Sequence, residues 1–318
     1  MASFYRREIL QQALTMIWRK KYLWWLGLFA GLATYGGEIN FLLNKYDTVA
    51  RFRKILSAIR NLFFEGQAQV FLQQLHRVWT TDAGRLLAYL AVAVLLVVFI
   101  FWLMLVSQGA LIRITGRVNQ KKATSFLDGI ATSSGKFWTL VQLNIMAALL
   151  GWGLLVLLAG VPAAIYLING LPAWSLVAHI TTIVSVVVSA MIAFLVQYAT
   201  AGIVLRDQTL MVAIIQSWRL FRQNLLVSVE MAVIIFLLNL ATLFVVLGVT
   251  VLLVSPFSVA GLLTILIIIA IEYAIMSAFS FAAWTITYLR LVEGSAESKI
   301  GRWTTQLVNF TKPKQVPS

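Results

Sequence analysis

Long apolar runs dominate the pattern of hydrophobic and polar positions along this chain. Five of them are long enough to cross a membrane: residues 86–112, 137–168, 174–205, 223–254 and 257–289. The first three contain no charged side chain, and the last two carry only Glu230 and Glu272. A helix needs about 20 apolar residues to cross the hydrocarbon core of a bilayer. The pattern therefore predicts five membrane-spanning helices, each with residues to spare for tilt.

The remaining segments have shorter or mixed patterns. Residues 22–36 form an apolar, glycine-rich run that predicts a sixth, shorter span. Residues 4–20 carry four apolar side chains on one helical face: Leu10, Leu14, Ile17 and Trp18. This face predicts an amphipathic helix that lies in the membrane interface. Residues 37–85 contain two stretches with the same spacing, 49–63 and 71–79, which predict two amphipathic helices on the outer side. Residues 290–318 form a polar tail.

Basic residues are distributed unevenly over the segments between the predicted spans. If residues 22–36 cross the membrane, 18 of the 25 lysines and arginines lie on the side of both termini and 7 lie on the other side. If these residues do not cross, the division becomes 13 against 12. Because lysine and arginine accumulate in cytoplasmic loops, the six-span arrangement is favoured. It places both termini in the cytoplasm.

The composition narrows the class of protein. Hydrophobic residues make up 61% of the chain and charged residues 11%, whereas soluble domains have about 25% charged residues. We therefore expect an all-α, six-helix integral membrane bundle with interfacial amphipathic helices, in one membrane domain over residues 1–318. The net charge is +14. Because the basic residues lie next to the ends of the spans, we expect them to contact anionic lipid headgroups and not nucleic acid. The absence of cysteine excludes disulfides and thiolate metal sites.

Two short segments at the ends of predicted spans are similar to each other. Gly109-Ala110-Leu111-Ile112-Arg113 ends one span, and Gly202-Ile203-Val204-Leu205-Arg206 ends another. The connectors that follow contain Ser125-Phe126 and Ser217-Trp218-Arg219-Leu220. With these motifs, residues 86–292 resemble the bacterial families grouped around the membrane domain found beside some glycerophosphodiester phosphodiesterases, and their YciC-like relatives. The resemblance implies a six-helix membrane domain with interfacial connector helices and no established chemistry.

Six polar residues inside the predicted spans are candidates for a role, because polar groups are costly there. Glu272 lies about halfway along the last span, and Asn239 lies at a similar depth on the span before it. Two interpretations are open for this pair: a neutral glutamic acid that forms one interhelical hydrogen bond, or a proton or cation site. The other four lie nearer the cytoplasmic edge: Glu230, Gln197, Asn144 and Gln142. These four either join helices through hydrogen bonds or line a polar cavity that faces the cytoplasm.

Small residues recur at every fourth position on two predicted spans. One set contains Ser185, Ser189 and Ala193, the other contains Ala270, Ala274 and Ala278, and Gly27 and Gly31 form a shorter set. Such sets let helix backbones approach closely, so we expect them at helix–helix contacts. Outside the spans, Arg51, Arg53 and Lys54 form a basic cluster. This cluster predicts either a solvated surface near lipid headgroups or a docking site for a partner or an anionic ligand.

The sequence contains no residue pattern that is typical of an enzyme. Phosphate-binding glycine motifs and zinc-ligand spacings are absent, and no serine or cysteine nucleophile has a buried base to accompany it. We therefore expect a non-enzymatic protein of the bacterial cytoplasmic (inner) membrane, without a cofactor, associated with anionic lipids or with another membrane protein. Two alternatives are a small-solute or proton-coupled transporter or channel, and an accessory subunit of a larger membrane complex.

Overall fold

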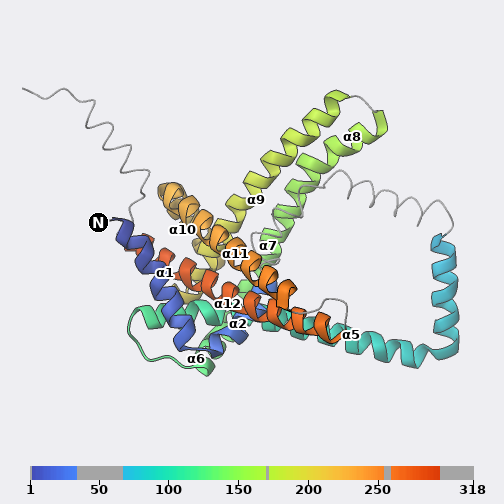
Figure 1. Ribbon diagram of the computed structural model, residues 1–318. Helices are drawn as coiled ribbons and strands as arrows, with labels where there is room; N and C mark the ends of the chain where they lie inside the picture. The colour runs from blue at the N-terminus through green and yellow to red at the C-terminus, as the bar shows by residue number, and fades with distance from the viewer. Residues whose placement is uncertain (1, 34–66, 170–171, 254–258, 294–318) are drawn as a thin grey trace, which may run out of the picture. The chain divides into compact units, whose positions relative to one another are not determined.

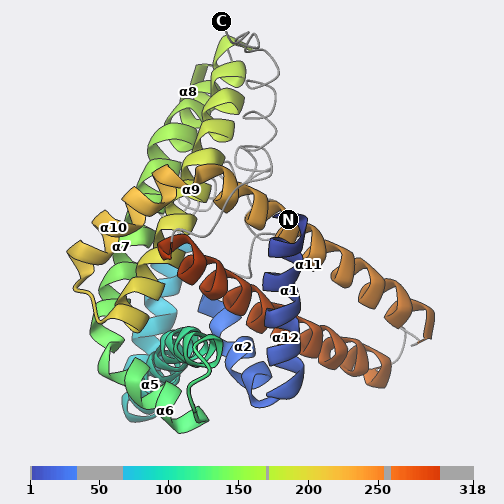
Figure 2. The same cartoon turned by 90° about the vertical axis from the view of Figure 1, so that its left-hand side faces the viewer.

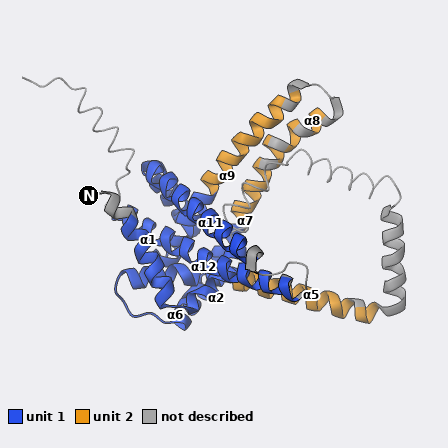
Figure 3. Ribbon diagram, in the orientation of Figure 1, with its two compact units in different colours: residues 1–39, 104–144, 193–318 blue, residues 40–103, 145–192 orange. Residues whose placement is uncertain are grey.

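The computed structural model describes residues 2–33, 67–169, 172–253 and 259–293. In this part of the chain every regular element is a helix (Figure 1). The helices form two compact units (Figure 3). Unit 1 comprises residues 1–39, 104–144 and 193–318, and unit 2 comprises residues 40–103 and 145–192.

Five described helices are long and apolar enough to cross a membrane. They contain the segments Ala83–Asn119, Phe137–Leu158, Leu176–Arg206, Leu225–Thr250 and Leu263–Val292. The prediction of an all-α protein with five helices long and apolar enough to span a membrane is therefore confirmed, whereas the sixth span and the orientation of the termini stay predictions. The shorter apolar helix Tyr22–Leu32 occupies the place of the sixth predicted span, whose last residues, 34–36, lie outside the described residues.

Two short helices at the start of the chain pack on its last helix within unit 1. α1 (Ala2–Arg19) and α2 (Tyr22–Ala33) both lie against α12 (Val259–Val292), as Figures 1 and 2 show. The buried face of α1 contains Ile9, Ala13, Met16 and Ile17. Leu14 and Trp18, which the helical spacing places near Ile17, are instead about half exposed. α1 thus has one apolar face against the protein and a second apolar face directed outward.

Small residues let α2 approach α12 closely. A Cβ atom on Gly27 would collide with the backbone oxygen of Ala274 and would lie 2.8 Å from the Cβ of Ala278. One turn later, a Cβ atom on Gly31 would lie 2.7 Å from the Oγ of Ser277. Ala274 and Ala278 are both buried. This spacing between the two helices therefore requires glycine at both positions of α2.

Two long helices end in unit 1, and each leads into a short connector helix. α5 (Gln67–Asn119) is followed by α6 (Phe126–Gly135), and α9 (Pro172–Arg206) is followed by α10 (Leu210–Gln223). A residue with a left-handed backbone lies just after each long helix: Lys121 with φ of 57° and Asp207 with φ of 53°. Each chain reversal thus begins with the same uncommon backbone conformation.

The two connector helices are also alike in detail. Ser125 and Thr209 occupy the N-cap positions of α6 and α10. In α6 the buried hydroxyl of Ser133 donates to the carbonyl of Gly129 at 2.9 Å. In α10 the buried hydroxyl of Ser217 donates to the carbonyl of Ala213 at 2.6 Å. The similarity seen in the sequence at the ends of the long helices therefore continues into the connectors.

Aromatic side chains hold α10 in unit 1. Phe221 of α10 stacks on Phe194 of α9 with ring centroids 5.4 Å apart, and Phe194 also contacts Trp284 of α12 at 5.5 Å. Tyr198 of α9 lies 6.0 Å from Trp284, and its hydroxyl is 2.7 Å from the hydroxyl of Ser228 on α11 (Leu225–Leu253). The cluster joins four helices and fixes which face of α10 turns inward.

A π-helix interrupts the predicted span of residues 137–168. α7 (Phe137–Leu155) passes into η1 (Val156–Gly160) and then into α8 (Val161–Asn169). Pro162 lies two residues after the end of the π-helix. Proline has no N–H to donate, and its ring crowds the carbonyl four residues earlier. The wider π turn accommodates this disruption, so the helix is interrupted and not ended.

Helix α5 begins well before the predicted span of residues 86–112. The stretch 71–79, predicted as a separate amphipathic helix, is continuous with the spanning helix. No proline lies between the two stretches, and Gly84 alone costs too little to end a long helix. The other predicted outer helix, 49–63, lies outside the described residues.

Candidate functional site

Polar side chains meet between α11 and α12, about halfway along two candidate spans of unit 1. The Nδ2 of Asn239 donates to a carbonyl of its own helix at 3.0 Å and to the Oγ of Ser280 at 3.2 Å. The hydroxyl of Thr242 donates to the backbone oxygen of Asn239 at 3.0 Å and lies beside the carboxyl of Glu272, which is half-buried. The Asn239 side chain therefore meets Ser280, which lies eight residues, or about 12 Å, along α12 from Glu272, whereas the residue beside the Glu272 carboxyl is Thr242.

The four polar residues predicted near the cytoplasmic edge lie in different surroundings. The side chain of Asn144 donates to the carbonyl of Leu140 in its own helix at 2.8 Å. Gln142 is exposed, whereas Gln197 and Glu230 are half-buried. Asn144 is thus satisfied within α7, and Gln142 is directed outward. The interpretation as a shared cytoplasmic cavity stays a prediction for Gln197 and Glu230.

The predicted sets of small residues are only partly buried. Three members are buried: Ser185, Ala274 and Ala278. Two are exposed, Ala193 and Ala270, and Ser189 is half-buried, with its hydroxyl 2.7 Å from the carbonyl of Ser185. Each set therefore runs from a packed region to an exposed one. The outer basic cluster of Arg51, Arg53 and Lys54 lies outside the described residues.

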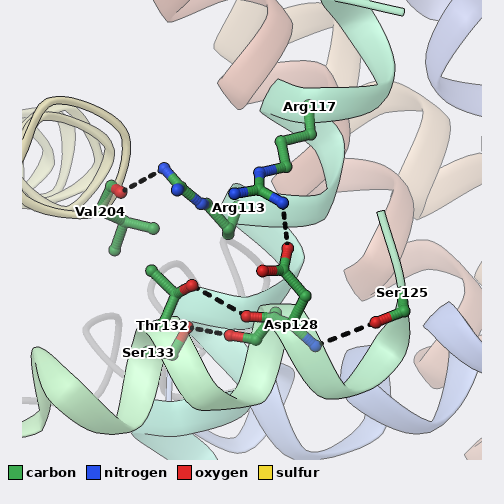
Figure 4. A network of polar contacts seen from close by, with 8 residues as sticks. Arg113, Arg117, Ser125, Asp128, Thr132, Ser133 and Val204 are labelled. Carbon is green, nitrogen blue, oxygen red and sulfur yellow. Dashed lines mark hydrogen bonds and ion pairs between the residues drawn. The ribbon is translucent and has the colours of Figure 1, made fainter. Parts of the chain in front are cut away.

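A network of polar contacts joins the end of α5 to α6 (Figure 4). Arg117 forms an ion pair with Asp128, with 2.6 Å between Nη1 and Oδ2. The Ser125 hydroxyl accepts the backbone N–H of Asp128 at 3.1 Å and so caps α6. The carboxylate is thereby held in the first turn of α6, where the helix dipole favours negative charge. Arg113 extends toward α9 and donates to the backbone oxygen of Val204 at 3.5 Å.

A second ion pair links the two connectors of unit 1. Lys136, just after α6, lies with its Nζ 3.0 Å from an oxygen of Asp207, just before α10. The hydrogen bond and the charge of Lys136 lower the pKa of the Asp207 carboxyl. Sequence reasoning missed both ion pairs because it used the connector charges only to orient the chain. Lys136 and Asp207 are 71 residues apart in the sequence, and Arg117 and Asp128, 11 residues apart, lie on different helices, so the pattern gave no signal that either pair meets.

α10 presents apolar side chains and arginines on its outer face. Met211, Ile215 and Trp218 follow helical spacing on one side of the helix and are 68%, 60% and 46% exposed. Arg219 and Arg222 are exposed beside them. The opposite face is buried in unit 1. The helix therefore carries one apolar face for the protein and another, bordered by positive charge, that the described residues do not cover.

Among the described residues, no group of three or more histidine, cysteine, aspartate or glutamate side chains is placed to hold a metal ion. No family model, no curated protein and no solved structure matches the chain. Fold and composition thus define the class, a multi-pass helical membrane protein. The resemblance to the phosphodiesterase-associated and YciC-like families stays a prediction.

Proposed function

We propose that this chain is a non-enzymatic protein of the bacterial inner membrane that binds anionic lipid headgroups through its connector helices. In this proposal it has six spans, with both termini in the cytoplasm. The observation that carries the proposal is the outer face of α10, where Met211, Ile215 and Trp218 lie beside Arg219 and Arg222.

The connections of α10 keep this face at the level of the membrane surface. Residues 207–209 separate α10 from α9, and Asn224 alone separates it from α11. Both neighbours contain candidate spans. A helix held in this position buries its apolar side chains at the boundary of headgroups and acyl chains. Arginines at its border then reach the phosphates, and each basic group near an anionic surface contributes about 1 kcal/mol.

α1 has the same combination of features and supports the same function. Leu14 and Trp18 are exposed on its outer side, with Arg19 and Lys21 exposed close by. Both helices belong to segments that the charge bias assigns to the cytoplasmic side, where the leaflet carries anionic lipids. Phosphatidylglycerol is therefore the lipid class with which we expect the protein to associate.

The first experiment uses the absence of cysteine to place one fluorescent probe at a time. Ile215→Cys and Gln216→Cys are exposed neighbours on α10 that differ by about 100° in direction. In vesicles that contain phosphatidylglycerol, a nitrobenzoxadiazole label at position 215 should be quenched by doxyl-labelled lipid. The label at position 216 should be quenched by aqueous iodide. Equal quenching of the two labels by both agents would contradict an interfacial position of α10.

The second experiment tests lipid preference directly. The thermal midpoint of the purified protein should rise more with added phosphatidylglycerol than with phosphatidylcholine, because an anionic lipid that binds the folded state stabilises it. The double variant Arg219→Gln/Arg222→Gln should lose much of this difference. An equal response of the wild-type protein to the two lipids would rule out the proposed function.

A further inference from the structure

The short helices α1, α6 and α10 each lead almost directly into an apolar helix. Lys20 and Lys21 separate α1 from α2, Lys136 separates α6 from α7, and Asn224 separates α10 from α11. In each case the carbonyl of the first break residue accepts an N–H of the outgoing helix, at 2.9, 3.0 and 3.0 Å, from Leu23, Leu140 and Ser228. The three connections are therefore built alike, and α1 belongs with the two connector helices.

Each of these helices also lies against an incoming helix. A Cβ atom on Gly129 of α6 would lie 2.8 Å from the Cδ1 of Ile114 on α5. Phe221 of α10 stacks on Phe194 of α9. α1 packs on α12 through its buried face. α12 thus takes for α1 the place that α5 takes for α6 and α9 takes for α10, so the two ends of the described chain complete a third unit of the same kind.

Contacts between the incoming helices repeat as well. α5, α9 and α12 each carry an arginine near the end: Arg113, Arg206 and Arg290. Arg113 donates to the carbonyl of Val204 on α9 at 3.5 Å. A Cβ atom on Gly202 of α9 would lie 3.4 Å from the hydroxyl of Tyr288 on α12. Val204 and Tyr288 each lie two residues before the arginine of their own helix, so each incoming helix meets the next one at the same level.

Equivalent connectors are expected to use their outer sides in the same way, and α6 has the features seen on α10 and α1. Leu127 and Ala131 lie one helical turn apart, and both are exposed. Trp138, at the start of α7, is 73% exposed. Lys121 and Lys122 are exposed just before α6. Each unit therefore has an exposed tryptophan within six residues of its break: Trp18, Trp138 and Trp218.

The connections of α6 hold it at the same surface as α10. The chain between these two helices contains two candidate spans, so both helices lie on one side of the membrane. Residues 120–125 separate α6 from α5, and both neighbours of α6 contain candidate spans. The ion pair between Lys136 and Asp207, at 3.0 Å, keeps the end of α6 beside the start of α10. At this level tryptophan is enriched and lysine meets lipid phosphate.

We propose that α6 and the start of α7 form a third membrane-surface contact of this protein, directed at anionic lipids. Leu127, Ala131 and Trp138 enter the boundary of headgroups and acyl chains, and Lys121 and Lys122 bind the lipid phosphates. The inference rests on the proposed function and adds a surface outside α10 and α1. Lipid is the occupant because spans on both sides place α6 at the bilayer surface and because the two lysines complement negative charge.

Two exposed alanines make a matched pair for the test: Ala131 on α6 and Ala123 in the segment before it. Each is replaced in turn by cysteine in the full-length, cysteine-free chain and labelled with nitrobenzoxadiazole, in vesicles that contain phosphatidylglycerol. Doxyl-labelled lipid should quench the label at position 131 at least about twofold more than the label at position 123, because apolar faces of interfacial helices lie among the acyl chains. Aqueous iodide should give the opposite order.

The label at position 215 of α10 is measured in the same vesicles, so that two kinds of failure can be told apart. If lipid quenches position 215 and iodide quenches position 131, α6 faces water and the inference is overturned, whereas the proposed function stands. If iodide quenches both positions, the inference and the proposed function fall together. Equal quenching at positions 131 and 123 by both agents would also overturn the inference.

The two lysines are tested through lipid preference. Lys121→Gln/Lys122→Gln should reduce the difference between the thermal midpoints in phosphatidylglycerol and phosphatidylcholine. Combination with the double variant of α10 should reduce it further, because effects at separate sites add. Lys136→Gln is the matched control and should keep the difference, because Asp207 already holds this ammonium group. A difference as large in the Lys121/Lys122 variant as in the wild type would show that these lysines bind no lipid and would overturn the proposal.

Discussion

At the scale of single residues, most hydroxyl side chains in the spans form hydrogen bonds within their own helix. Thr285 and Thr287 are buried in α12, and each donates to the carbonyl four residues earlier, at 2.7 and 2.8 Å. Such bonds make serine and threonine inexpensive inside a membrane and reveal nothing about function. Asn239 differs because it also bonds to Ser280 on another helix. Only a hydrogen bond to a different helix links a polar residue to its tertiary surroundings.

The Lys136–Asp207 ion pair gives a pH-dependent prediction. The pKa of Asp207 lies below its ordinary value of 3.8 in the folded protein, because Lys136 stabilises the carboxylate. A lowered pKa contributes stability above the unfolded-state pKa, and this contribution is lost as the pH falls through the folded-state pKa. Asp207→Asn tolerates the left-handed backbone and should lower the thermal midpoint slightly at neutral pH. The effect should stay within about 1 kcal/mol, because the side chain is exposed.

The control for this prediction is the variant Lys136→Gln, alone and combined with Asp207→Asn. The second substitution should add little to the first, because both remove the same ion pair. The difference between Asp207→Asn and the wild type should begin to shrink below about pH 4, near the unfolded-state pKa, and should disappear once the pH is below the lowered folded-state pKa. A difference that persists in acid would mean that Asp207 acts through its backbone conformation and not through its charge.

At the scale of helices, the sequence shows which residues share a face but not what that face contacts. In a soluble protein the apolar face of a helix is the packed one. In a membrane both the lipid-facing and the protein-facing sides are apolar, so hydrophobicity does not separate them. This is why Leu14 lies outside whereas Ile17 lies inside, and why Ala270 is exposed whereas Ala274 is buried. Glycine gives a stronger signal, since it is costly in a helix without close packing.

The contact between α2 and α12 provides a test at this scale. Gly27→Ala should destabilise the protein by about 1–3 kcal/mol, because the added methyl group has no space against the backbone of Ala274. Gly151→Ala in α7 is the matched control. Nothing lies within 4 Å of its Cβ position, and alanine favours a helix by about 1 kcal/mol over glycine. Thermal midpoints in detergent should fall for the first variant and stay level or rise for the second; equal values would show that α2 and α12 are not in close contact.

At the scale of the whole molecule, hydropathy alone predicts the five long spans, because apolar length is the quantity that a bilayer selects. The interruption at Pro162 and the continuation of α5 before residue 86 depend on local hydrogen bonding, which hydropathy does not report. The ion pairs of the connectors and the Asn239–Ser280 contact depend on which helices become neighbours. That information is not contained in the pattern of one chain, because many pairings of apolar helices satisfy the same pattern.

The sixth span is the point at which two physical arguments oppose each other. α2 has 12 residues, which corresponds to about 18 Å of helix at 1.5 Å per residue, against a hydrocarbon core of about 30 Å. The charge bias nevertheless favours a crossing by residues 22–36, because the basic residues divide 18 against 7 if these residues cross and 13 against 12 if they do not. Bilayer thinning and the snorkelling of flanking lysines cost only fractions of a kcal/mol per Å of mismatch. We therefore expect the charge bias to prevail.

Whether residues 22–36 cross the membrane can be tested with single cysteines introduced into the cysteine-free chain. Each cysteine is treated with an impermeant maleimide in intact cells. Gln11→Cys, Lys122→Cys and Ser298→Cys should stay unlabelled until the membrane is permeabilised, and Gln67→Cys should label at once. Gln11, exposed on α1, is the decisive position. If it labels in intact cells while Lys122 stays protected, residues 22–36 do not cross; if Lys122 also labels, the whole orientation is reversed and the lipid-binding face of α10 is on the wrong side of the membrane for the proposed function.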